Sequence, residues 1–227
     1  MISITIDGPS GSGKSTIAKL LAEKLGFLTL DTGALYRTVA YYFFKNNIDY
    51  KITNNVIKNL KNINISVHHK NGIQLIYLNE EDVTNFIRTP EISTIASDVS
   101  AIPEVRKFLI NIQRDFAKTH NVVMDGRDIG TVILPNADIK FFLTASPENR
   151  AQRRYNQLLK KNPNKKVVLK DIMKSINNRD FNDSNRKISP LTPAKNAIIV
   201  DNSFLSVEET IDIFLNTIKE RAIIEAK

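Results

Sequence analysis

The chain has 227 residues, of which 42% are hydrophobic, and its 32 basic and 24 acidic residues give a formal net charge of +8. This size allows one large domain or a domain with an insertion, the absence of cysteine excludes a disulfide framework, and no apolar run approaches the roughly 20 residues that cross a bilayer. The charge fits nucleic acid, a membrane surface or a small polyphosphate as partner. The first residues, MISITIDG, lack the features of a secretory signal, so we expect a cytoplasmic protein.

The first part of the chain predicts two strands that each lead into a helix. ISITI (residues 2–6) is a β-branched run, and the helical spacing of apolar residues in STIAKLLAEKLG (15–26) ends at Gly26. FLTL (27–30) is the next short apolar run, and a helix is predicted over ALYRTVAYYFFKNN (34–47).

An antiparallel insert is predicted next, over about residues 60–98, between core segments at 1–59 and 99–227. Two alternating segments flank Asn71-Gly72, a strong hairpin signal, and Val83 is the expected start of a third strand. His68 and His69 are adjacent, so a strand points them to opposite faces, and no other metal ligands cluster nearby. We therefore expect both histidines at the surface.

Three later segments complete the predicted sheet: NVVMD (121–125), IKFFLTA (139–145) and AIIVDN (197–202). Near-continuous apolar runs are typical of strands covered on both faces, which indicates five parallel strands. Ser206 and Glu209 form a capping-box pattern before the last helix. The fold class is therefore α/β, doubly wound, with ligands bound at the carboxyl ends of the strands.

The segment GPSGSGKST matches the phosphate-loop pattern G-x-x-x-x-G-K-[ST] between a predicted strand and a predicted helix. An ordinary glycine-serine turn is the alternative, but pattern and context agree on a nucleotide-binding loop. Lys14 is then placed to reach the β- and γ-phosphates, and Ser15 to coordinate Mg²⁺. The predicted ATP-binding residues are Gly8, Pro9, Ser10, Gly11, Ser12, Gly13, Lys14, Ser15 and Thr16.

Polar residues also follow the second and third predicted core strands. Asp31 and Thr32 come at the end of one, and Asp125, Arg127 and Asp128 at the end of the other. A helix cap at Asp31 and a hairpin turn at Asp125 are the simpler readings, although a crossover segment after Asp128 rules out the hairpin. At the same sheet edge as the phosphate loop, Asp125 or Asp31 could order metal-bound water and Arg127 could hold a phosphate.

Two helices add further charges. Ser146 and Pro147 start a predicted arginine-rich helix that leads into a lysine-rich segment, which resembles a mobile lid over about residues 150–166. In a later helix, apolar residues from position 169 to 176 form a stripe, and the same spacing continues into Arg179, Asp183 and Arg186. A solvated helix end is the alternative, but charges that prolong the apolar side suit a cleft wall.

The segments TIDGPSGSGKST, LDTGALYR, DGRDIGTVILPNADIKFFLTAS and RDFNDSNRKISPL together resemble the bacterial-type cytidylate kinases over nearly the whole chain. The phosphate loop is widely shared, whereas the Asp-Gly-Arg-Asp segment and the late Arg-Asp-rich helix are specific to that family. The resemblance implies a P-loop kinase core with an enlarged monophosphate-binding insert. It also implies transfer of the ATP γ-phosphoryl group to CMP or dCMP, with Mg²⁺, by a monomer.

Carried over to this chain, the resemblance places the acceptor phosphate among Arg37, Arg127 and Arg186, close to Thr32 and Tyr36. Thr32 stands where a serine is also common in the family, which keeps the hydroxyl.

For the rest of the acceptor, the resemblance implies that Ser97, Arg106 and Asp128 read cytosine. Arg179 and Asp183 would bind the sugar hydroxyls.

The expected catalytic groups are Lys14, Arg127, Asp128 and Arg154, with Arg154 in the lid and no obligatory general base. Phosphoryl transfer needs positioned positive charge more than covalent help from the protein, which explains the arginines. A kinase for UMP, AMP or shikimate is the nearest alternative. A basic nucleic-acid-binding NTPase is another, but the sequence shows no base-stacking platform, so we expect neither nucleic acid nor membrane as a partner.

Overall fold

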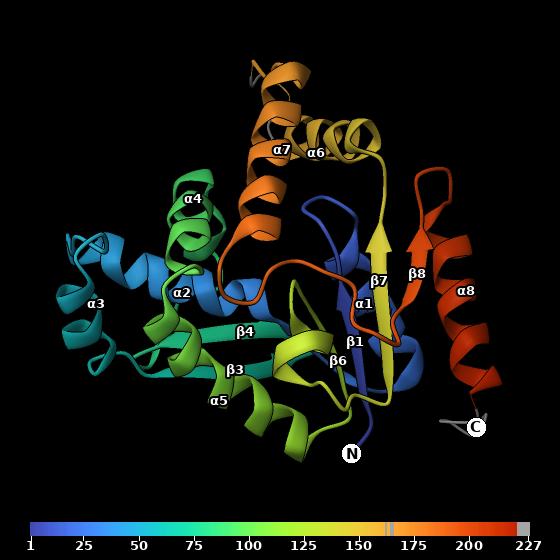
Figure 1. Ribbon diagram of the computed structural model, residues 1–227, viewed down its shortest axis with the longest axis horizontal. Coiled ribbons are helices and arrows are strands. Elements are labelled where there is room, and N and C mark those ends of the chain that lie inside the picture. The colour runs from blue at the N-terminus through green and yellow to red at the C-terminus, as the bar shows by residue number, and fades with distance from the viewer. Residues whose placement is uncertain (162, 164–165, 222–227) are drawn as a thin grey trace.

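The computed structural model describes residues 1–161, 163 and 166–221, and its centre is a parallel sheet (Figure 1). The sheet has five strands in the order β2-β6-β1-β7-β8, and every neighbouring pair is parallel. The strands are β1 (Ser3–Asp7), β2 (Leu28–Asp31), β6 (Val122–Gly126), β7 (Ile139–Thr144) and β8 (Ile198–Asp201). The predicted doubly wound α/β fold with five parallel strands is confirmed.

Helices cover both faces of this sheet, and the surroundings of β6 explain its apolar run Val122–Met124. Val122 and Met124 pack into a core with α2 (Thr32–Lys45) and α5 (Pro103–Thr119). Val123 faces the other way, into a core with α1 (Lys14–Leu25) and α8 (Val207–Glu220). Because alternate residues of a strand point to opposite faces, a sheet with two covered faces favours apolar residues on both sides of each strand.

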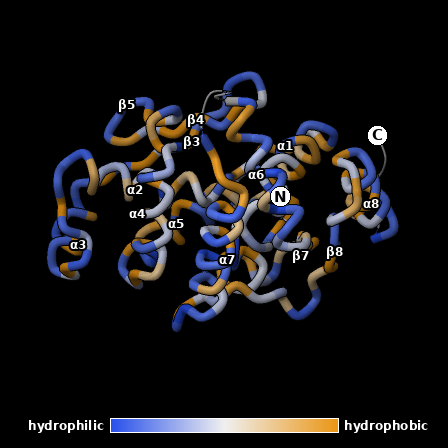
Figure 2. Tube along the Cα trace, turned by 90° about the horizontal axis from the view of Figure 1, so that it is seen from above, coloured by the Kyte–Doolittle hydropathy of each residue, from blue (hydrophilic) through white to orange (hydrophobic). Residues whose placement is uncertain are grey.

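The predicted helix boundaries follow from local chemistry. α1 ends at Gly26, whose φ of 67° lies in the left-handed region that favours glycine. α8 begins with the complete capping box of Ser206 and Glu209. Seen from above, α8 and α3 (Thr53–Leu60) lie at opposite ends of the molecule (Figure 2).

The insert forms a separate antiparallel sheet of β3 (Ile65–Lys70), β4 (Ile73–Leu78) and β5 (Glu81–Asp82). Asn71 and Gly72 form its two-residue turn with φ of 52° and 71°, as a type I′ hairpin requires. The expected third strand is misplaced, because β5 ends before Val83, which is fully buried. Helix α3 precedes this sheet, and η1 (Phe86–Arg88) and α4 (Pro90–Val99) follow it; the domain limits of 60–98 stay a prediction.

The two adjacent histidines differ in their surroundings. His68 is exposed, as expected. His69 is half-buried, with its Nε2 2.8 Å from the Thr29 carbonyl oxygen and its ring beside Phe116, so the surface prediction is wrong for His69. The strand points it toward the core edge of β2 rather than into solvent. Within the described ranges, no three acidic, histidine or cysteine residues are grouped as a metal site would need.

Two helices rise beyond the carboxyl ends of the strands, α6 (Pro147–Lys161) and α7 (Leu169–Asn185), and they pack against each other (Figure 1). Residues 162, 164 and 165 of the predicted lid lie outside the described residues. Arg186 follows α7 in an extended conformation instead of continuing the helix as predicted. Over the described part of the chain, no helix has the length and apolar character to cross a membrane.

Candidate active site at the carboxyl edge of the sheet

The predicted phosphate loop joins β1 to α1, and its glycines meet real steric demands. A Cβ on Gly8 would collide with the carbonyl oxygen of Leu143 in β7. The Lys14 ammonium lies folded within the loop, where Nζ donates to the carbonyl oxygen of Pro9 at 2.6 Å and lies 3.3 Å from Ser12 Oγ. Burial lowers the pKa of Lys14 well below its usual range, and the nearby Arg127 guanidinium lowers it further. Burial therefore destabilises the charged form of Lys14, and a bound anion would offset this destabilisation.

Residues from the two protruding helices hold this loop in place. The Ser10 N–H donates to Asp180 at 2.9 Å, and Arg150 pairs with Asp180 while donating to the Ser10 carbonyl oxygen at 2.8 Å. Arg153 donates to Asn202, at 2.9 Å to its side chain and 2.6 Å to its carbonyl oxygen, and also to the Ser12 carbonyl oxygen of the loop at 3.4 Å. Two arginines of the predicted lid helix are thus anchored beside the phosphate loop.

Arg154 differs from these two arginines. It donates to Gln157 of its own helix at 2.6 Å, and its role in a lid stays a prediction. The sequence did not predict the contributions of Asp180 and Asn202, because both residues act through contacts between segments that are distant in the chain.

Two carboxylates stand side by side at the ends of β2 and β6, where Asp31 and Asp125 occupy paired positions. The Ser15 hydroxyl donates to Asp125 at 2.7 Å. Burial raises the pKa of Asp125 to about 7, and the negative charge of Asp31 adds to this shift. A hydroxyl next to a buried carboxylate is an oxygen donor set that suits Mg²⁺, which takes few protein ligands and keeps water and phosphate oxygens as the others.

The end of β2 connects these acids to the predicted acceptor-phosphate residues. Asp31 caps α2 by accepting the Ala34 N–H at 3.0 Å, as the simpler reading held, and it also pairs with Arg37 at 2.7 Å. The Thr32 hydroxyl donates to the carbonyl oxygen of Asp125 at 2.9 Å. A Cβ on Gly126 would lie 2.6 Å from Thr32 Oγ1, so only glycine allows this close approach.

Asp128 is buried between two cations. Its carboxylate forms an ion pair with Arg106 and lies 3.8 Å from Arg186. The Arg106 guanidinium also lies 5.6 Å from the centre of the Tyr36 ring, within cation–π range. Burial raises the pKa of Tyr36 to about 12, so its hydroxyl stays protonated at neutral pH. The structure brings these four predicted residues into one group.

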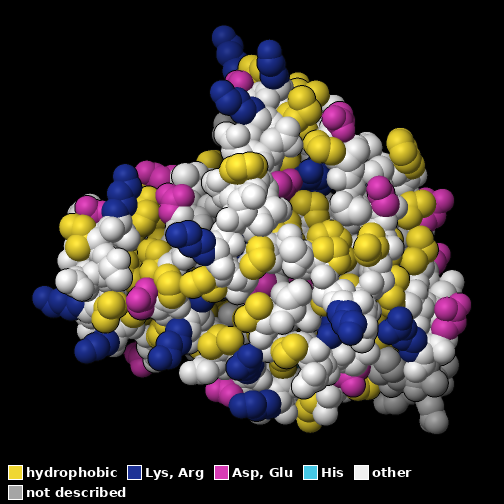
Figure 3. Space-filling model, in the orientation of Figure 1, with side chains coloured by type: hydrophobic (Ala, Val, Ile, Leu, Met, Phe, Trp, Pro, Cys, Tyr) yellow, Lys and Arg dark blue, Asp and Glu magenta, His cyan; other side chains and the backbone are white. Residues whose placement is uncertain are grey.

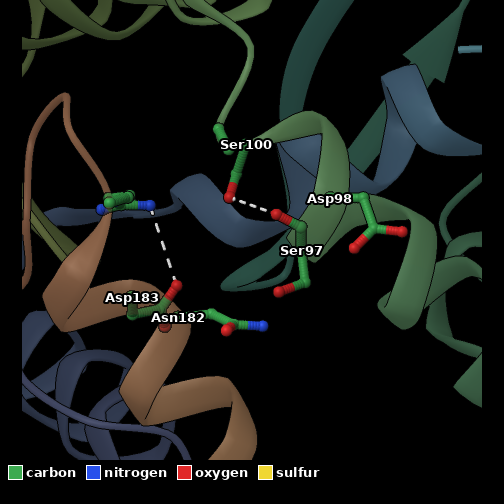
Figure 4. Close-up of a pocket in the computed structure, with 7 residues that line it drawn as sticks. Ser97, Asp98, Ser100, Asn182 and Asp183 are labelled. Atoms are coloured by element: carbon green, nitrogen blue, oxygen red, sulfur yellow. Dashed lines mark hydrogen bonds and ion pairs between the residues drawn. The ribbon is translucent and has the colours of Figure 1, made fainter. Parts of the chain in front are cut away.

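Asp183 gathers the remaining predicted residues. It accepts from Arg127 Nε at 2.8 Å and lies 3.7 Å from Arg186. A pocket of about 130 Å³ opens between α4 and the end of α7, lined by Ser97, Asp98, Ser100, Ala101, Asn182, Asp183 and Arg186. In Figure 4, Ser97 and Asp183 lie on opposite walls of this pocket. The predicted base-reading Ser97 therefore faces the predicted sugar-binding carboxylate.

Several guanidinium N–H groups at this site have no hydrogen-bond acceptor within the described ranges. They are Arg37 Nε, Arg179 Nε and Arg186 Nη2, and all three are buried. Burial among like charges lowers the pKa of Arg179 to about 10, which still leaves it cationic at neutral pH. Buried donors are nearly always paired in native proteins, so these three groups could donate to an anionic ligand.

Sequence reasoning also missed Asp7, the last residue of β1. It is 2% exposed, and its two carboxylate oxygens accept the N–H groups of Ile129 and Gly130 at 2.8 Å each. The available signal was its place: an acid closes β1 just as Asp31 closes β2.

The site has two parts at one edge of a parallel sheet: a phosphate loop and a separate group of cationic side chains. These are the features of a P-loop kinase, which binds a phosphate donor and a phosphate acceptor side by side. A family model described as cytidylate kinase matches residues 4–220. A cytidylate kinase of Fervidobacterium nodosum is 47% identical over 219 residues, 96% of each chain. One of Carboxydothermus hydrogenoformans is 46% identical over 215 residues, 95% of this chain and 96% of the relative. The chain belongs to the cytidylate kinase family.

Among solved structures, an uncharacterized protein from Eubacterium ventriosum shares the fold. Its TM-score is 0.56 at 14% identity, over 96% of this chain and 99% of that chain.

Proposed function

We propose that this chain transfers the γ-phosphoryl group of ATP to CMP and dCMP in pyrimidine nucleotide metabolism. The observation that carries the proposal is that Arg37, Arg179 and Arg186 each have a buried guanidinium N–H without a hydrogen-bond acceptor among the described residues. Family membership supports cytidine monophosphates as acceptors. Lys14 and Arg127, which belong to the two proposed phosphate-binding regions, are close enough for the Arg127 charge to lower the pKa of Lys14.

For the donor, the loop N–H groups and Lys14 would bind the ATP phosphates. Lys14 would exchange its contacts with Pro9 and Ser12 for phosphate oxygens, which removes the cost of a buried cation. Mg²⁺ fits the oxygen atoms of Ser15 and Asp125, and bound there it would neutralise charge that develops on the phosphates. Arg154 remains a candidate for a donor-side contact.

For the acceptor, Arg37, Arg127 and Arg186 would hold the phosphate of the monophosphate. Thr32 fixes the end of β6 through its bond to Asp125, so its part is to shape this subsite. The carboxylate of Asp128 would accept the cytosine N4 amine, since a carboxylate accepts from that donor.

The residues at the pocket wall would hold the rest of the nucleoside. Ser97 and Arg106 would complete the base contacts, and Arg179 and Asp183 would take the sugar hydroxyls.

Catalysis would rest on position and charge. The arginines offset repulsion between two anionic substrates and orient the acceptor oxygen toward the γ-phosphorus, and no side chain needs to accept the proton before transfer. Closure of α6 and α7 over the site would exclude water as a competing acceptor.

The test is ADP release with ATP and Mg²⁺ against a panel of CMP, dCMP, UMP and AMP. We expect CMP and dCMP to be the best acceptors. Faster turnover of AMP than of CMP would refute it. A parallel assay without Mg²⁺ tests whether the reaction requires the metal. Equal activity with and without Mg²⁺ would show that it does not.

We also propose action as a cytoplasmic monomer. One copy of the chain supplies every binding group named above. The Lys and Arg side chains on the face in Figure 3 are scattered among acidic and apolar ones, in contrast to the convergent arginines of the site. Size-exclusion chromatography with light scattering tests the monomer.

A further inference from the structure

A single turn of π-helix follows Asp128 directly. It is η2 (Ile129–Ile133), with the wide-turn hydrogen bonds of Ile133 N–H to the Asp128 carbonyl oxygen at 3.2 Å and of Leu134 N–H to that of Ile129 at 2.7 Å. The Val132 N–H also donates to the Asp128 carbonyl oxygen at 2.9 Å. Single π turns are uncommon and occur often at functional sites. The backbone of Asp128 is thus fixed by the turn that it begins.

The first end of this turn is held by Asp7. One carboxylate oxygen accepts the N–H of Ile129 and the other accepts that of Gly130, both at 2.8 Å. Asp7 is 2% exposed, so a carboxylate is kept in the core at the cost of desolvation. The reaction proposed above gives Asp7 no contact with either substrate, which leaves its burial unexplained.

The other end of the turn is held by Arg114 of α5. Its Nε donates to the carbonyl oxygen of Ile133 at 3.0 Å, and its Nη2 donates to that of Val132 at 2.9 Å. A carboxylate on the free N–H groups and a guanidinium on the free carbonyl groups satisfy both ends of a short turn. The two side chains come from β1 and α5, which both contact η2 although η2 lies between β6 and β7 in the chain.

We propose that Asp7 and Arg114 are positioning residues that clamp η2 and thereby hold the Asp128 carboxylate between Arg106 and Arg186, where it selects the acceptor base. This inference rests on the proposed function, because it assigns base selection to Asp128. Neither residue touches substrate. Their effect reaches the base through the backbone of residues 128–133.

A purely structural role makes a different prediction from a positioning role. Loss of a structural contact lowers the folded fraction, and hence turnover with every acceptor alike. Loss of position moves the carboxylate that accepts the cytosine amine, and uracil carries a carbonyl oxygen in place of that amine. The discriminating quantity is therefore the ratio of kcat/KM for CMP to that for UMP.

The experiment compares native protein with Asp7→Asn and Arg114→Ala. Asn keeps the size of Asp7 but turns a donor toward one of the two N–H groups. Asp138→Asn is the matched control, because Asp138 accepts the Ser3 N–H at 2.7 Å at the opposite, exposed end of β1. Circular dichroism and thermal unfolding establish the folded fraction of each variant before kinetics.

We expect both variants to raise the KM for CMP at least about tenfold and to reduce the CMP/UMP ratio by a similar factor, with the KM for ATP within about twofold of native. Asp138→Asn should leave all three quantities unchanged. Arg114→Ala leaves the core acid in place, so it decides the outcome alone if Asp7→Asn does not fold.

An unchanged KM and CMP/UMP ratio in a folded Arg114→Ala variant would overturn the inference while the proposed function stands. Native protein without activity on CMP would instead refute the proposed function.

Discussion

The Asp128 carboxylate is the residue on which acceptor selection should depend most. It is buried with Arg106 and Arg186, and no other acidic side chain of the described chain pairs with both. We expect Asp128→Ala to lower kcat/KM for CMP at least about thirtyfold, because it removes an acceptor and leaves two cations buried without it. Steady-state kinetics with varied CMP at saturating ATP measures this decrease in kcat/KM. The KM for ATP should equal that of native protein.

The control for this change is Asp115→Ala, which removes an exposed carboxylate paired with Lys118. Exposed pairs contribute little, so its kinetics should match native. If kcat/KM for CMP in Asp128→Ala equalled that of native protein, Asp128 would have no role in base recognition.

Lys14 should affect the reaction with every acceptor equally. Its ammonium lies inside the phosphate loop, and Lys14→Ala removes the cation that we propose binds the donor phosphates. We expect kcat to fall at least about a hundredfold with CMP and with UMP, as is typical when one charge-stabilising group is lost. Lys118→Ala on the exposed face of α5 provides the comparison, and near-native turnover in Lys14→Ala would contradict the loop mechanism.

At this scale the sequence identified the residues with a fixed spacing and missed those that act through tertiary contacts. The phosphate-loop pattern located Lys14 and Ser15, since their chemistry depends on neighbours in the chain. Asp180 reaches Ser10 across 170 positions, and no local pattern records such a contact. Such contacts can be identified only from the three-dimensional structure.

Among the elements, α8 offers a test of stability apart from activity. Ser206 accepts the Glu209 N–H at 3.1 Å, and Glu209 accepts the Ser206 N–H at 2.8 Å. Ser206→Ala should lower the free energy of unfolding by about 1 kcal/mol, as loss of a helix cap does. Because α8 packs on the sheet face away from the acceptor site, kcat/KM should stay within about twofold of native.

Urea unfolding measures this effect. Ser175→Ala, at an exposed position within α7, is the matched change without a cap, and it should be neutral or slightly stabilising. Equal stability of Ser206→Ala and native protein would show that the capping box contributes nothing.

Elements were predictable where burial alone determines them. Short apolar runs predicted the five strands, since both faces of the sheet are covered and most strand positions are buried. The π turn at 129–133 was not predictable, because its sequence IGTVI reads as strand or helix and its form depends on Asp7 and Arg114. Arg186 left its helix for a related reason: periodicity describes which side chains share a face, and says little about where backbone hydrogen bonds end.

At the scale of the whole molecule, α7 joins the two halves of the site. Asp180 holds the phosphate loop through Ser10, and Asp183, one turn later, holds Arg127 of the acceptor side. A shift of α7 would therefore move residues of both proposed substrate sites together. This arrangement places many buried charges in one network, and its protonation should be visible in the stability of the entire fold.

Asp7 gives that network a measurable pH dependence. Burial raises its pKa from 3.8 to about 6, Asp128 adds to the shift, and Lys14 with the N–H groups of Ile129 and Gly130 opposes it. For an acid with a raised folded-state pKa, stability is fully present below the unfolded value and is lost as the pH rises through the folded value. Between pH 5 and 7.5 this group should therefore lower the free energy of unfolding by about 1–2 kcal/mol.

The measurement is urea unfolding of native protein and Asp7→Asn at both pH values. Asn does not titrate, so the difference in free energy of unfolding, native minus variant, should fall by that amount as the pH rises. The opposite sign would mean that the two N–H groups of η2 stabilise the carboxylate more than burial destabilises it. Asp115→Asn is the matched control, because it makes the same change at an exposed carboxylate of α5. If the free energy of unfolding changed equally with pH in native protein and in Asp7→Asn, a group other than Asp7 would be responsible for the pH dependence.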